Sequence, residues 1–135
     1  MNQGSYVLAQ VFDLINRYEF DKCVNTYNGN YRVKVFKCWE QFIVMSFAQL
    51  SYRESLRDIE FCLGGMQSKL YHCGLKTKIA RSTLAKANEK RPWEMYADLA
   101  QTLITKTVPL YKGENNLAKE LETIVYAFDS TIIDL

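Results

Sequence analysis

The stretch KCWEQFIVMSFAQL, residues 37–50, decides the fold class of this chain. Drawn as a helix, it carries apolar side chains on most of its sides. A helix that is apolar nearly all round belongs inside a protein rather than on its surface. The stretch therefore predicts a central, largely buried helix against which other segments pack; its large apolar residues are Trp39, Phe42, Ile43, Met45, Phe47 and Leu50.

The segments before this stretch also show helical spacing. Apolar residues recur three and four positions apart in residues 8–15 and again in residues 20–27. The sequence Asn28-Gly29-Asn30 follows and is typical of a turn. Two further helices are therefore expected ahead of the central one, with a briefly extended segment over residues 31–35.

The segments after it predict more helices. Ser51 to Glu54 fits a capping box that opens a helix through Leu63, and Gly64-Gly65 is expected to end that helix in a left-handed turn. A short helix is expected at residues 67–73.

A basic helix and a longer one are expected next. Ser82 is positioned to cap a helix from Thr83 to Lys90. Pro92 lacks a backbone donor and suits the first turn of a helix over residues 93–106. We therefore expect a mainly α protein, a helical bundle with a domain spanning residues 1–108.

Charge is segregated along the chain, although the formal net charge is only +2. Residues 1–68 hold seven basic and seven acidic residues, and residues 92–135 hold three basic and seven acidic. Between them, residues 69–91 hold seven basic residues against Glu89 alone, a net charge of +6. Such a basic block is the electrostatic footprint of a protein that binds nucleic acid.

The order of helices 54–63, 67–73 and 83–90 is typical of a helix-turn-helix variant, in which the last helix enters the DNA major groove. Arg81 can read guanine and Asn88 can pair with adenine. The alternative is an amphipathic helix whose lysines only keep the protein soluble. On the first interpretation the candidate DNA-binding residues are Lys76, Lys78, Arg81, Ser82, Thr83, Lys86, Asn88, Lys90 and Arg91.

The composition changes after Val108. Residues 109–122 are rich in turn-forming residues and predict a linker. Residues 123–128 are apolar on both alternating faces and predict a buried strand, which delivers Asp129 at its end. We expect one or two C-terminal β-strands over residues 123–135.

This ending, Asp129-Ser130-Thr131, resembles the first catalytic motif of the DDE transposases of bacterial insertion sequences. Similarity to one subgroup of these transposases continues, in order, over nearly the whole chain. It is carried by residues 1–4, 37–42, 49–58, 67–72 and 81–91.

The resemblance implies an RNase H-like catalytic domain that begins with this strand and is truncated just after its first aspartate. In the complete family enzyme three acids hold two Mg²⁺ ions for phosphoryl transfer on DNA. Asp129 matches the first of these acids, as a catalytic residue and metal ligand, whereas the other two have no counterpart in the chain. We therefore expect no tight metal binding and no DNA cleavage by this chain alone.

The resemblance also implies partners: the terminal repeats of a mobile element, and the full-length transposase or a second copy of the chain. A helical protein-association domain, or an inert relic of a decayed element, is the alternative. No signal peptide or membrane-spanning run is evident, so a cytoplasmic protein is expected. Four cysteines lack the short spacing of zinc ligands and are expected to be structural thiols: Cys23, Cys38, Cys62 and Cys73.

Overall fold

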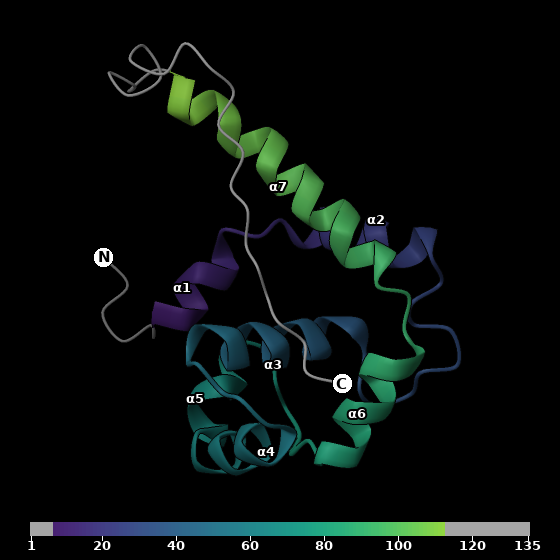
Figure 1. Ribbon diagram of the computed structural model, residues 1–135, viewed down its shortest axis with the longest axis vertical. Helices are drawn as coiled ribbons and strands as arrows, with labels where there is room; N and C mark the ends of the chain where they lie inside the picture. The colour runs from purple at the N-terminus through teal and green to yellow at the C-terminus, as the bar shows by residue number, and fades with distance from the viewer. Residues whose placement is uncertain (1–6, 113–135) are drawn as a thin grey trace. The chain divides into compact units, whose positions relative to one another are not determined.

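The computed structural model describes residues 7–112. The chain is mainly helical there, as the sequence predicts, and this part contains no β-strand (Figure 1). The strand expected at residues 123–135, and Asp129 with it, lie outside the described residues. The helices are α1 (Val7–Asp13), α2 (Arg17–Thr26), α3 (Cys38–Leu50), α4 (Leu56–Gly65), α5 (Gln67–Tyr71), α6 (Arg81–Lys90) and α7 (Glu94–Lys112).

Helix α3 is the central element, which confirms the prediction for residues 37–50. It lies between α1 and α2 on one side and α4, α5 and α6 on the other (Figure 1). Val44 and Phe47 pack in a cluster with residues of α4, α5 and α6, including Leu84, whereas Ile43 packs with Phe12 of α1. Helix α3 therefore buries apolar side chains on opposite faces, and their removal from water contributes to the stability of the fold.

Aromatic side chains fill the space between α3 and the two N-terminal helices. The ring of Phe20 lies 5.0 Å from that of Trp39 and 5.3 Å from that of Phe42, measured between centroids. Phe42 also stacks on Tyr96 of α7, at 6.3 Å. These separations fall in the range where aromatic pairs attract one another beyond simple burial.

The cap of α4 differs from the prediction. Ser51 follows the last residue of α3, and its hydroxyl donates to the Phe47 carbonyl rather than capping a new helix. Ser55 is the cap of α4, where its hydroxyl accepts a hydrogen bond from the backbone N–H of Asp58 at 3.1 Å. The predicted capping box was therefore wrong by four residues, because the backbone from Ser51 to Glu54 turns before α4 begins.

Replacement of Ser55 by alanine is expected to lower the free energy of unfolding by about 1 kcal/mol, the usual cost of losing an N-cap. Ser82→Ala is the matched control, because the sequence predicts a cap there but Ser82 lies inside α6. Its expected change is within about 0.5 kcal/mol. Urea unfolding of the two variants measures both values, and a larger loss for Ser82→Ala would contradict the assignment.

The left-handed turn predicted at Gly64-Gly65 lies at a later glycine. Gly64 and Gly65 both belong to α4, and neither has the positive φ that was expected of them. Gly74, after α5, does have a positive φ of 99°, so the left-handed turn lies there. Among the glycines of residues 7–112, Gly74 is therefore the one that needs the conformational freedom of glycine for a left-handed turn.

Helix α7 is longer than predicted. It continues to Lys112 and contains Pro109, so the first four residues of the expected linker are helical. A compact unit of the chain ends at Leu99, within α7. The groove described below lies entirely in that first unit.

Candidate nucleic-acid interface

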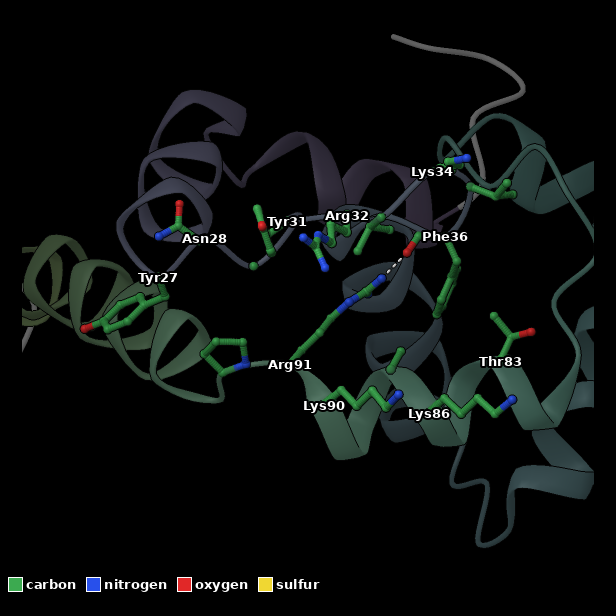
Figure 2. Close-up of a pocket in the computed structure, with 15 residues that line it drawn as sticks. Tyr27, Asn28, Tyr31, Arg32, Lys34, Phe36, Thr83, Lys86, Lys90 and Arg91 are labelled. Carbon is green, nitrogen blue, oxygen red and sulfur yellow. Dashed lines mark hydrogen bonds between the residues drawn. The ribbon is translucent and has the colours of Figure 1, made fainter.

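A groove of about 750 Å³ lies between the loop that follows α2 and the exposed side of α6 (Figure 2). The loop forms one wall with residues 27–36, and α6 forms the other with Thr83, Lys86 and Lys90. The groove is open to solvent, so a large, charged ligand can reach both walls. It is completed by Ala87, Arg91 and Pro92.

The side chains that line this groove carry positive charge only. The loop contributes Arg32 and Lys34, and the helix and the residue after it contribute Lys86, Lys90 and Arg91. These are five cations, and no aspartate or glutamate is among the lining residues. A hollow lined by charges of one sign concentrates ions of the opposite sign. The groove is therefore suited to a polyanion.

The loop that follows α2 is held against the body of the protein, and its charged side chains, Arg32 and Lys34, are exposed. Asn28 and Arg32 have positive φ values of 52° and 56°, which turn the backbone twice within a few residues. The Asn30 side chain accepts a hydrogen bond from the backbone N–H of Cys38, at 2.8 Å. Gly29 is buried between them, where a Cβ atom would lie 2.7 Å from the Met95 sulfur. The loop is thus held close to the body of the protein.

Arg91 joins the two walls of the groove. Its guanidinium donates to the backbone carbonyl of Phe36 and, at 2.7 Å, to the side-chain oxygen of Gln41 (Figure 2 shows the first bond). The guanidinium carbon also lies 5.2 Å from the centroid of the Phe36 ring. Arg91 therefore fixes the end of the loop against α3 and the end of α6.

Gln41 is at the centre of this network and is only 3% exposed. Its oxygen also accepts a hydrogen bond from the Tyr96 hydroxyl at 2.9 Å, and its nitrogen donates to Asn88 at 2.6 Å. Burial raises the pKa of Tyr96, so its hydroxyl remains a donor across the physiological pH range. These hydrogen bonds offset the free-energy cost of removing the Gln41 amide from water.

Three predicted DNA-binding residues lie together in the groove, where Thr83, Lys86 and Lys90 line one side of α6 (Figure 2). Within the described part of the chain, no other residue holds their side-chain functional groups in place. The side chains of two further predicted residues are engaged by hydrogen bonds within the protein. Arg91 lines the groove but is bound to Phe36 and Gln41, and the amide of Asn88 faces Gln41 rather than the groove.

The N-terminus of α6 differs from the prediction. The helix begins at Arg81, with Ala80 rather than Ser82 as its cap, and the Glu60 carboxylate of α4 accepts a hydrogen bond from the Arg81 backbone N–H at 3.1 Å. An acid at this end is favourable for the helix dipole. The leading backbone donor of α6 is therefore occupied, and the side chains of Arg81 and Ser82 do not line the groove.

The two lysines before α6 lie elsewhere. Lys76 lines a separate hollow with Arg17 and Lys37, and Lys78 lines another with Arg57 and Glu60. The basic block of residues 69–91 is thus divided among three surfaces.

The loop cations were missing from the sequence-based prediction. Arg32 and Lys34 lie in a segment whose overall charge is neutral, so a count of charge along the chain does not reveal them. The expected extended segment over residues 31–35 was wrong, since Arg32 lies in a turn with a positive φ, and no local pattern indicated that these two cations share a wall of the groove.

Among residues 7–112 there is no group of three or more His, Cys, Asp or Glu residues that could hold a metal ion. All four cysteines are free thiols. Burial raises the pKa of Cys38 and of Cys73, which keeps these thiols protonated and poor as nucleophiles or ligands. No helix in this part of the chain is long and apolar enough to cross a membrane.

Fold and groove together define a helical protein with a cationic surface groove. Residues 3–76 match the family described as Domain of unknown function (DUF4372), and the chain belongs to this family. Searches of the curated proteins and of the solved structures found no significant match.

Proposed function

We propose that this chain is the N-terminal DNA-binding part of an insertion-sequence transposase, and that it recognises the ends of the element. The observation that carries the proposal is the groove lined by five cations and no carboxylate. Such a surface neutralises phosphates, which supply most of the affinity of proteins for DNA. The resemblance to DDE transposases, stated above on motifs along the chain, supplies the biological context.

In this proposal the groove takes the place of the helix-turn-helix contact expected from the sequence. The order of α4, α5 and α6 resembles such a unit, and α4 packs against α6. The leading backbone donor of α6 is engaged by Glu60, however. DNA contact is therefore proposed along the side of α6 that carries Lys86 and Lys90, and at Arg32 and Lys34 of the loop.

The catalytic part of the proposal concerns Asp129, outside the described residues. By resemblance, Asp129 would be the first of three acids that hold two Mg²⁺ ions in the complete enzyme. One carboxylate does not form a two-metal site, so the chain alone is proposed to bind DNA without cutting or joining it.

Gel shifts with the full chain test the proposal directly. The terminal repeats of a matching element are compared with random DNA of equal length, at several salt concentrations. The expected result is tighter binding to the repeats, weakening steeply as salt rises because counterions are released when phosphates are bound. If neither DNA shows salt-dependent binding, or if the repeats show no preference over random DNA, the proposal is wrong.

A further inference from the structure

The shape of the groove limits the form of DNA that it can take. A recognition helix must project from its protein to enter the major groove, which is about 12 Å wide. The cationic side of α6 instead lines a hollow, and the loop with Arg32 and Lys34 forms the opposite wall (Figure 2). The loop wall therefore restricts how closely a double helix can approach this side of α6.

A single strand has the opposite requirements. It is narrow and flexible, and proteins that bind it combine a cationic groove for the backbone with exposed aromatic rings on which bases stack. The groove has such a ring: Tyr31 is 69% exposed and lines the loop wall. The guanidinium carbon of Arg32 lies over the Tyr31 ring, 5.1 Å from its centroid, so the cation covers one face of the ring and a base would stack on the opposite face.

We infer that the groove binds single-stranded DNA, with phosphates between the loop cations Arg32 and Lys34 and the helix cations Lys86 and Lys90, and with a base stacked on Tyr31. The inference rests on the proposed function and goes beyond it, because it names unpaired DNA as the preferred ligand. At the ends of an element, the groove would hold a strand that has separated from its complement.

Fluorescence anisotropy with the full chain tests this inference. The probe is a labelled DNA strand of about 16 nucleotides, the upper site size of a single-strand-binding domain. It is measured alone and as a duplex with its complement, at one low salt concentration. The single strand is expected to bind at least roughly tenfold more tightly than the duplex, because one stacked base contributes about that much.

Tyr31→Ala should weaken binding of the single strand roughly tenfold and leave duplex binding unchanged, whereas Tyr31→Phe keeps the ring and should preserve affinity. Tyr18→Ala is the matched control, because Tyr18 is 76% exposed and does not line the groove. Equal or tighter binding of the duplex, or no effect of Tyr31→Ala, would overturn the inference.

The two proposals fail in different ways. If Lys86→Ala and Lys90→Ala weaken duplex binding while Tyr31→Ala changes nothing, the inference is wrong, and the preference for the terminal repeats alone decides the proposed function. If neither form of DNA binds, both are wrong.

Discussion

Replacement of both Lys86 and Lys90 by alanine is expected to lower the affinity for DNA, single-stranded or duplex, roughly twentyfold to sixtyfold at about 0.1 M salt. Each lysine is taken to neutralise one phosphate, and each such contact contributes about 0.7 to 0.9 to the slope of log K against log salt. The slope should therefore become less steep by about 1.4 to 1.8. Anisotropy titrations of the wild type and the double variant over a range of salt concentrations measure both changes.

Lys76→Ala together with Lys78→Ala is the matched control. It removes the same charge from the same basic block, but neither lysine lines the groove. The affinity of this variant should fall by less than about threefold, since only weakened long-range attraction is expected. Equal losses in the two double variants would mean that net charge, and not the groove, determines binding.

Replacement of Arg91 by alanine is expected to lower the free energy of unfolding by roughly 2 to 4 kcal/mol, because two charge-assisted hydrogen bonds are lost at once. The Phe36 carbonyl and the buried oxygen of Gln41 would lose a charged donor, and Tyr96 would remain as the side-chain donor to Gln41. Urea unfolding followed by circular dichroism measures the loss.

Lys90→Ala is the control for this prediction, since Lys90 precedes Arg91 and is exposed. Its unfolding free energy should change by less than about 0.5 kcal/mol. Arg91→Lys keeps the charge but not the planar fork, and should recover only part of the stability. A fully stable Arg91→Ala variant would contradict this prediction and show that the network is dispensable.

The sequence predicted the helical character of the chain and its central helix because both depend on local patterns. Apolar residues on most sides of residues 37–50 indicate burial whatever the partners are, and α3 is the central helix with Ile43, Val44 and Phe47 buried, although Met45 and Leu50 are exposed. The short helix after Gly65 and the basic helix that ends at Lys90 were predicted for the same reason.

Features set by distant residues were not predicted. Glu60 accepts a hydrogen bond from the backbone N–H of Arg81, 21 positions away, and Gln41 accepts one from the Arg91 guanidinium, 50 positions away. Neither contact can be predicted from a pattern of residues that are neighbours in the sequence. The predicted cap at Ser82 was therefore wrong, and the hydrogen bonds of Arg91 to Gln41 and Phe36 were not foreseen.

The close packing at Gly29 has a consequence for redesign of the groove. The missing side chain lets the backbone settle against the sulfur atoms of Met95 and Cys38, at distances that any added methyl group would violate. A larger residue at position 29 would force the Met95 side chain, the Cys38 side chain or the loop backbone to shift. The seat of the loop that carries Arg32 and Lys34 therefore depends on the combined volume of residues 29, 38 and 95, none of which carries a charge.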